Sequence, residues 1–230
     1  LEKTVAKGKM SEGDKDTILG RIKGTTNMED MKDCDFVIEA AIEDIELKKR
    51  IFASLDNICP KETILSTNTS SMSVIHLATA TKRVPQVVGT HFFNPVPVMR
   101  LVEVVRTVAS SDESVDIAKK FCESLGKTVI MAKDTPAFIV NRILVPFMLD
   151  AIRVYESGIA TKEDIDNGMV LGCNHPIGPL ALTDLLGLDT LVDVANSMYE
   201  EFKEPRFAPP TLLKKMIAAG YLGRKSSKGF

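Results

Sequence analysis

The sequence predicts an α/β protein whose first half is an open, mostly parallel sheet and whose second half is all-helical. Short apolar runs typical of strands alternate with helical segments up to about residue 133, and no convincing strand follows residue 134. A chain of 230 residues can also bury a core without disulfides or metals. We therefore predict two domains, 1–133 and 134–230.

The elements of the first half follow one another in a regular order. Residues 1–22 have a helical pattern with lysines on polar faces. The predicted elements are then strand 34–41, helix 43–58, strand 63–67, helix 72–79, strands 87–91 and 101–107, helix 112–125 and strand 128–132. This alternation indicates parallel strands covered by helices.

The second half contains signals for helix starts and ends. Asp134-Thr135-Pro136 predicts a helix start, because aspartate caps helices and proline needs no amide partner there. That helix should run to about Ser157 and kink at Pro146. Thr161 and Asp164 have capping-box spacing. Further helices are predicted at 184–202 and 210–219.

Composition and charge exclude several classes of protein. The formal net charge of -2 argues against broad binding of nucleic acid, which needs a concentrated positive surface. The four cysteines show no C-x-x-C spacing and no paired histidine, so no zinc or redox motif is indicated. No apolar run approaches the roughly 20 residues of a membrane span, so we expect no membrane partner. Isolated thiols fit a reducing compartment, and we expect a cytoplasmic protein, or a mitochondrial matrix protein in a eukaryote.

His91 is the first candidate for chemistry. It lies in His91-Phe92-Phe93-Asn94-Pro95, one of only three histidines, and Glu103 follows twelve positions later. A neutral imidazole titrates near physiological pH, and a carboxylate can orient it and stabilise its charged form. The local pattern is equally consistent with a hydrogen-bonded structural histidine at a strand end.

Polar residues follow two predicted strands at the edge where open α/β sheets bind ligands. Thr67-Asn68-Thr69-Ser70-Ser71 can bond a substrate oxygen, or one member can cap the next helix. Glu43 follows the strand 34–41, where a nucleotide could lie, although its place at a helix start favours a role opposite the helix dipole.

Three further segments have competing interpretations. Asn141, on a largely apolar helical face near the domain boundary, can point into a cleft or be satisfied by backbone. His175, in a turn rich in proline and glycine, is interpreted as structural. The cations at 48–50 and 224–228 are interpreted as a solvated helix face and a solvated tail, and either could contact phosphates.

Taken together, these segments resemble the 3-hydroxyacyl-CoA dehydrogenase family, and most of all its short bacterial-type members, the 3-hydroxybutyryl-CoA dehydrogenases. The resemblance covers essentially the whole chain, with its motifs in order. They are STNTSS at 66–71 with the preceding strand, HFFNPVPVMRLVEVV at 91–105, DTPAFIVNRIL at 134–144, LGCNHPIGPLALTDLLGLD at 171–189 and LGRKSSKGF at 222–230. The fold implied is an incomplete Rossmann-type doubly wound sheet followed by an all-helical C-terminal domain.

The resemblance implies a reaction. The family oxidises the 3-hydroxyl of an (S)-3-hydroxyacyl-CoA, here 3-hydroxybutyryl-CoA, to the ketone with NAD, and also reduces acetoacetyl-CoA, in fatty-acid or butanoate metabolism. NADP also remains open, because the residue that selects between the two lies in a second strand that this chain lacks.

It also implies roles for individual residues. His91 would be the base, Glu103 its orienting carboxylate, and Ser70 and Asn141 the groups that bond the reacting oxygen or thioester carbonyl. The positions that match cofactor contacts are Glu43, Lys48, Ser70, Asn94 and Lys225. Lys3 and Lys7 match basic residues of the helical arm that meet the phosphates of CoA.

The sequence departs from the family pattern in two places. Ala137 stands where members often carry glycine, a change that we expect a helix to tolerate. The family also opens with a strand, a G-x-G-x-x-G turn and a helix, and no such turn occurs here. Without them the strand at 34–41 would expose an apolar edge, so we expect a fragment with little dehydrogenase activity of its own.

Two other functions compete with the dehydrogenase. One is a non-catalytic fragment that binds acyl-CoA or mediates dimerisation, and the other is a relative that acts on a free hydroxy acid. We expect a homodimer through the helical half, because this half has more apolar positions than its own fold should cover. These positions are Leu180, Leu182, Leu185, Leu186, Leu188 and Leu191.

Overall fold

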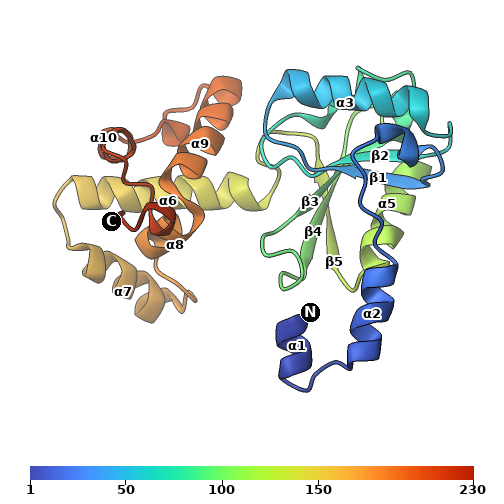
Figure 1. Ribbon diagram of the computed structural model, residues 1–230. Helices are drawn as coiled ribbons and strands as arrows, with labels where there is room; N and C mark the ends of the chain where they lie inside the picture. The colour runs from blue at the N-terminus through green and yellow to red at the C-terminus, as the bar shows by residue number, and fades with distance from the viewer.

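The computed structural model describes residues 1–230, which form two halves that meet at the start of the helix α6 (Val140–Glu156) (Figure 1). The first half contains a five-stranded sheet. Its strands are β1 (Phe36–Glu39), β2 (Ile64–Thr67), β3 (Val87–Phe92), β4 (Leu101–Arg106) and β5 (Thr128–Lys133). All five predicted strands are therefore present, and their ends differ from the predicted ones by no more than two residues.

The sheet is mostly parallel, as predicted. Its order is β1-β2-β3-β4-β5, and only the β3–β4 pair is antiparallel. The carboxyl ends of β1, β2 and β3 therefore lie at one edge. In the antiparallel pair, His91 is directly opposite Glu103, which places both side chains on the same face.

Each face of the sheet is covered by different helices, because successive side chains of a strand point to opposite faces. The helices are α3 (Ile45–Ile58), α4 (Val74–Ala78) and α5 (Asp112–Ser124), with 3-10 turns η1 (Met28–Met31) and η2 (Val84–Gln86). Leu65 and Val87 pack in one apolar cluster with α3 and α4. Ile64 and Val88, their neighbours along the strands, pack with α5 on the other face. Two buried faces account for the near-continuous apolar runs in these strands.

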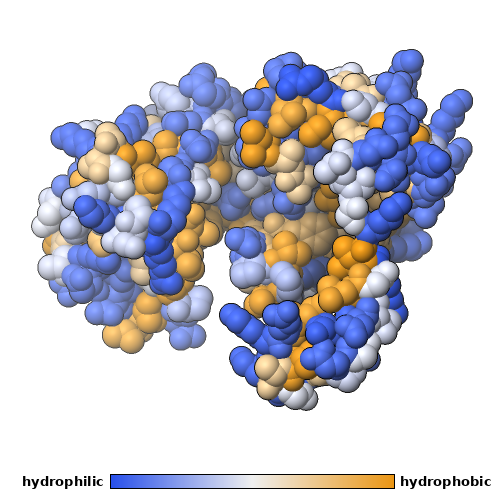
Figure 2. All heavy atoms as spheres, viewed as in Figure 1, coloured by the Kyte–Doolittle hydropathy of each residue, from blue (hydrophilic) through white to orange (hydrophobic).

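The N-terminal residues form a helical arm that projects from the α/β half (Figure 1). The helical pattern predicted over 1–22 is confirmed, and the structure divides it into two helices, α1 (Glu2–Ala6) and α2 (Glu12–Gly20). Gly8 has φ 66, and Ser11 begins the second helix by accepting the Asp14 amide. Figure 2 shows the molecule hollowed between this arm and the helical half.

The helical half is built around one apolar core. Its helices are α6 (Val140–Glu156), α7 (Lys162–Cys173), α8 (Pro179–Leu186), α9 (Leu188–Phe202) and α10 (Thr211–Ala218), with 3-10 turns η3 (Pro205–Phe207) and η4 (Arg224–Ser226). Gly187, with φ 101, divides the predicted helix 184–202 in two. None of these helices, nor any in the α/β half, has both the length and the apolar composition that a membrane span requires.

The core of this half explains part of its leucine content. Leu180, Leu188 and Leu191 are buried among its fourteen core residues. Leu185 and Leu186 remain 50% and 46% exposed. The expectation that the six leucines are not covered by their own half is therefore wrong for Leu180, Leu188 and Leu191.

The helix α6 begins six residues later than the sequence predicts. Asp134 does not cap it; its Oδ1 accepts the Val74 amide at 2.8 Å and its Oδ2 the Ile75 amide at 2.7 Å. Asp134 thus caps α4, whose own N-cap residue, Ser73, makes no side-chain capping bond. None of Thr67 to Ser71 caps that helix either. Predicting the start of α6 from Asp134 was wrong because the capping carboxylate serves a distant helix.

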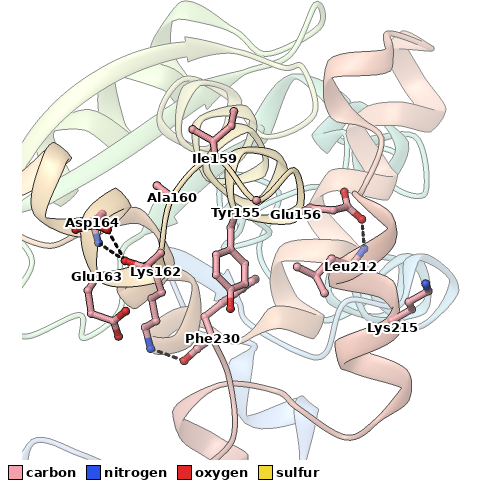
Figure 3. Close-up of a pocket in the computed structure, with 12 residues that line it drawn as sticks. Tyr155, Glu156, Ile159, Ala160, Lys162, Glu163, Asp164, Leu212, Lys215 and Phe230 are labelled. Carbon is pink, nitrogen blue, oxygen red and sulfur yellow. Dashed lines mark hydrogen bonds between the residues drawn. The ribbon is translucent and has the colours of Figure 1, made fainter.

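The last residue, Phe230, folds back onto the helical half (Figure 3), whereas the cations Arg224, Lys225 and Lys228 are exposed, as predicted. The Phe230 amide donates to Asp184 Oδ1 at 2.9 Å, and Lys162 Nζ donates to the Phe230 carbonyl. In the same region, Glu156 Oε1 accepts the Leu212 amide at 2.7 Å and so caps α10 from the end of α6. These contacts join α6, α7, α8 and α10 around one hollow.

Candidate active site

A cleft of about 300 Å³ lies where the carboxyl ends of β1, β2 and β3 face α6 and α9. Its polar lining residues are Glu43, Asn68, Ser70, His91, Asn94, Asn141 and Thr190. Its apolar lining residues are Phe92, Phe93, Val145, Met148, Leu186, Leu191 and Val194. Such an edge of an open α/β sheet is the usual position of a ligand. The structure thus brings five of the residues predicted for a site to one cleft: Glu43, Ser70, His91, Asn94 and Asn141.

His91 and Glu103 form a buried pair. His91 Nδ1 lies 2.6 Å from Glu103 Oε2, and the two residues are 6% and 0% exposed. A carboxylate only accepts hydrogen bonds, so the proton of the neutral ring is on Nδ1. The other ring nitrogen, Nε2, has no partner within the protein. His91 lines the cleft, so Nε2 is the atom available for proton transfer.

Aromatic rings hold the imidazole from two sides. The Phe93 ring centroid is 4.6 Å from that of His91, and the Phe138 centroid is 5.6 Å away. Phe138 belongs to the apolar core of the α/β half. The imidazole therefore has little freedom to rotate away from Glu103.

Ser70 and Glu43 come from neighbouring loops that are bonded to each other. The Ser70 amide donates to Glu43 Oε1 at 3.3 Å, and Thr69 Oγ1 donates to Glu43 Oε2 at 2.8 Å. Asp44 caps α3, and Glu43 directly precedes this cap, so its predicted place at the helix start is confirmed. The Ser70 hydroxyl makes no hydrogen bond within the protein and can bond a ligand.

Asn141 enters the cleft from the first turn of α6. Its side-chain amide makes no hydrogen bond within the protein, so the alternative of a buried, backbone-satisfied asparagine is wrong. The carboxylate that orients His91 also holds this helix, because Glu103 Oε1 accepts the Ile139 and Val140 amides at 3.1 and 3.0 Å.

The sequence indicated Asn68 only as one member of the polar run 67–71, and it did not indicate Thr190 at all. Asn68 Oδ1 accepts the Phe92 amide at 2.9 Å and so fixes the end of β3 next to His91. Its position directly after β2 was the available signal. Thr190, on α9, had no signal in the sequence, because only packing of the helical half brings it to the sheet edge.

Lys48 is buried, which corrects its interpretation as part of a solvated helix face. Its side chain is 1% exposed, and its Nζ lies 2.7 Å from Glu39 Oε1 and 3.0 Å from the Ala41 carbonyl oxygen. Thr67 Oγ1 donates to the other oxygen of Glu39 at 2.7 Å. A buried charge needs such partners. Lys48 therefore supports the loop that carries Glu43 from beneath.

Three of the predicted lysines lie outside the cleft. Lys3 and Lys7 are exposed on the N-terminal arm, and Lys3 lines a shallow hollow with Leu1, Lys15 and Leu19. Lys225 is paired with Asp189 near the start of α9. Burial acts to raise the pKa of Asp189, but hydrogen bonds from Lys225 and from backbone amides outweigh it and the pKa is lowered.

Comparison with known proteins assigns the family. The model of the 3-hydroxyacyl-CoA dehydrogenase NAD binding domain matches residues 1–135, and that of the 3-hydroxyacyl-CoA dehydrogenase C-terminal domain matches residues 138–230. This chain belongs to the 3-hydroxyacyl-CoA dehydrogenase family. The resemblance inferred from the sequence motifs is thereby confirmed.

Bacterial 3-hydroxybutyryl-CoA dehydrogenases are among the relatives that this chain resembles. The 3-hydroxybutyryl-CoA dehydrogenase of Clostridioides difficile is 46% identical over 230 residues, which are 100% of this chain and 82% of the relative. The crystal structure of (S)-3-hydroxybutyryl-CoA dehydrogenase from Ralstonia eutropha has a TM-score of 0.96 and 47% identity, covering 99% of this chain and 81% of that one. The crystal structure of Mycobacterium tuberculosis FadB2 has a TM-score of 0.97 and 46% identity, with the same coverage.

The residues present fit the nicotinamide end of NAD, the cofactor of this family. The cleft lies at the carboxyl ends of parallel strands, and Glu43 and Asn94 are both exposed at its rim. The aromatic and aliphatic lining can pack against a planar ring. The 230 residues contain no G-x-G-x-x-G turn, so this fit concerns the nicotinamide end alone.

Proposed function

We propose that this chain carries the catalytic and acyl-CoA-binding residues of an NAD-dependent (S)-3-hydroxybutyryl-CoA dehydrogenase. The observation that supports this most is the buried His91–Glu103 pair, with Nε2 of the imidazole left free in a cleft that Ser70 and Asn141 also line. A base, its orienting carboxylate and two hydrogen-bond donors are what oxidation of a secondary alcohol requires.

In the proposed mechanism, His91 Nε2 takes the proton of the substrate 3-hydroxyl. The hydride would leave the carbon that bears this hydroxyl for NAD, which Glu43, Ser70 and Asn94 would hold at the rim of the cleft. Glu103 stabilises the imidazolium that forms, because it already accepts the hydrogen bond from Nδ1. In the reverse direction the imidazolium returns the proton to the 3-keto oxygen of acetoacetyl-CoA.

Ser70 and Asn141 hold the substrate from opposite sides of the cleft. The Ser70 hydroxyl comes from the loop after β2 and the Asn141 amide from α6, and neither has a protein partner. The Ser70 hydroxyl and the Asn141 amide donate hydrogen bonds to the reacting oxygen and the thioester carbonyl of the substrate. Apolar residues such as Met148, Leu191 and Val194 exclude water around them, which strengthens these hydrogen bonds.

Cofactor contacts are assigned to the rim of the cleft. Glu43, Ser70 and Asn94 lie there, and Lys48 supports the Glu43 loop. Lys225 is assigned to the cofactor from outside the cleft, where it is paired with Asp189 next to the cleft residue Thr190. We assign the CoA phosphates to Lys3 and Lys7, since both ammonium groups are exposed on an arm beside the hollow between the halves.

We also propose two domains, 1–133 and 134–230, and a homodimer formed through the second. An apolar groove of about 500 Å³ along α6 and the turn before α8 supports the dimer. Its lining includes Ile139, Ile143, Phe147, Ile177 and Leu182. Ile143 is 70% exposed. Sedimentation that shows only monomer at micromolar concentration would contradict this proposal.

A cytoplasmic location is proposed from the four free cysteines.

The test is acetoacetyl-CoA-dependent oxidation of NADH by the wild type and by His91→Ala. The assay uses this chain alone and also preceded in frame by the strand–turn–helix of the C. difficile relative, so that the result does not depend on the phosphate-binding turn. We expect turnover to fall about 10²–10⁴-fold in His91→Ala while acetoacetyl-CoA binding is retained. The control is His76→Ala, which removes an exposed histidine of α4. An equal rate in His91→Ala and the control would contradict the proposal.

The same assay separates the two other functions. A non-catalytic acyl-CoA-binding protein would bind acetoacetyl-CoA with no turnover in either form of the chain. An enzyme for free hydroxy acids would turn over free acetoacetate and would not be inhibited by free CoA.

A further inference from the structure

We propose that Glu103 also positions Asn141, by holding the start of α6 through its second carboxylate oxygen. The inference rests on the proposed function and adds to it a second task for the carboxylate. Oε2 binds His91 Nδ1, whereas Oε1 accepts the Ile139 and Val140 amides at 3.1 and 3.0 Å. Asn141 is the next residue along the chain. One buried side chain thus sets the place of both the base and the substrate-binding amide.

The start of α6 has no other capping side chain. The N-cap residue, Ile139, has a side chain that cannot accept a hydrogen bond, so the Ile139 and Val140 amides at the start of this 17-residue helix depend on Glu103. Glu103 is fully buried, and a buried carboxylate needs hydrogen-bond donors around it. The helix dipole, positive at this end, adds to the attraction.

The corner before α6 has a strained backbone, so contacts around it must hold its shape. Ala137 and Phe138 have φ values of 65 and 47. An L-residue rarely adopts this left-handed conformation, because its Cβ approaches the following carbonyl oxygen. Both residues are buried, Ala137 in the core of the helical half and Phe138 in that of the α/β half. Without the bonds to Glu103, the corner could relax and carry Asn141 away from His91.

Affinity for acetoacetyl-CoA, measured by calorimetry in a His91→Ala background, separates the two tasks of Glu103. In this background any effect of Glu103 on affinity cannot pass through the imidazole. In Glu103→Leu, the leucine side chain is similar in size to glutamate but accepts no hydrogen bond. We expect it to weaken acetoacetyl-CoA binding about tenfold, which corresponds to the loss of about one hydrogen bond. Glu103→Gln is the matched control. Its amide oxygen can still accept from the Ile139 and Val140 amides, so its affinity should stay within about threefold.

A third substitution tests whether the effect passes through Asn141. In the His91→Ala, Asn141→Ala background, Glu103→Leu should no longer change the affinity. An unchanged affinity on adding Glu103→Leu to His91→Ala, or a tenfold loss that persists without Asn141, would overturn the inference. If Glu103→Leu does not fold, Glu103→Asp replaces it in the same His91→Ala background. The shorter aspartate side chain cannot reach both amides, so we expect a similar loss of affinity for acetoacetyl-CoA. An affinity within twofold of that of His91→Ala alone would then overturn the inference. If neither the wild type nor His91→Ala binds acetoacetyl-CoA, the proposed function itself fails.

Discussion

The outer helices of the α/β half and the helices at the corner between the two halves find different acceptors for their first backbone amides. On the outside, α3 and α5 are capped by the residue that immediately precedes them, Asp44 and Ser111. At the corner, α4 and α6 are capped by Asp134 and Glu103, which are 60 and 37 positions away from the amides they accept. The outer helices therefore depend on their local sequence, whereas those at the site depend on the finished fold.

This difference indicates where function and folding are coupled. A locally capped helix can lose its cap without moving the cleft. A remotely capped helix transmits any change of its capping carboxylate to the loops beside His91. The helical half uses the same device twice, because Asp166 caps α8 and Glu156 caps α10. We therefore expect substitutions of these acids to have larger effects than substitutions of local caps.

The largest effect should come from Asp134→Ala. This change leaves the Val74 and Ile75 amides and the Ser73 hydroxyl without their acceptor. We expect the free energy of unfolding to fall by about 3 kcal/mol. The local cap Ser111→Ala should cost only about 1 kcal/mol. Urea denaturation of both variants measures the difference, and equal losses would contradict the distinction between the two kinds of cap.

The outer helix α5 should lose more stability at alkaline pH than the corner between the two halves. Burial raises the pKa of the Cys122 thiol, on the inner face of α5, from 9.0 to about 11. Because the folded state holds this proton more tightly, its contribution to stability is present below pH 9 and is lost as the pH rises toward 11. The loss should be about 1–2 kcal/mol. Cys122→Ala, which has no thiol there, should show a smaller loss between pH 8 and 10.5 in urea denaturation; an equal loss would refute the assignment.

The corner should gain stability from Ala137→Gly. Glycine adopts φ 65 without the cost that alanine meets there, so we expect a gain of about 1 kcal/mol. The matched control is Ala118→Gly, in the middle of α5, which should instead lose about 1 kcal/mol or more. Thermal denaturation compares the two, and a loss in both variants would show that the corner is not strained.

The sequence predicted features that depend on neighbouring residues. The five strands followed from their apolar runs, and the Thr161 cap of α7 followed from its spacing to Asp164, whose amide it accepts at 3.2 Å. Asp134 looked like a local cap by the same rule, although its partners lie on α4. The assumption that a helix would tolerate Ala137 was also wrong, because Ala137 lies in the left-handed corner outside α6.

The candidate site was predictable only in part. Motifs indicated His91, Ser70 and Asn141, and their joint position in one cleft needed the structure. The burial of Lys48 against Glu39 could not be predicted, because nine positions separate the two and only the loop between β1 and α3 brings them together. The same holds for the bonds between Glu103 and α6, which join residues of the two halves.

The central claim is that Glu103 keeps the proton of the neutral His91 ring on Nδ1, so that Nε2 is free to accept the substrate proton. Nitrogen NMR of the protein labelled at histidine distinguishes the two ring nitrogens directly. We expect the Nδ1–H form for His91 in the wild type and a loss of this preference in Glu103→Leu. A wild-type ring protonated on Nε2 would contradict it.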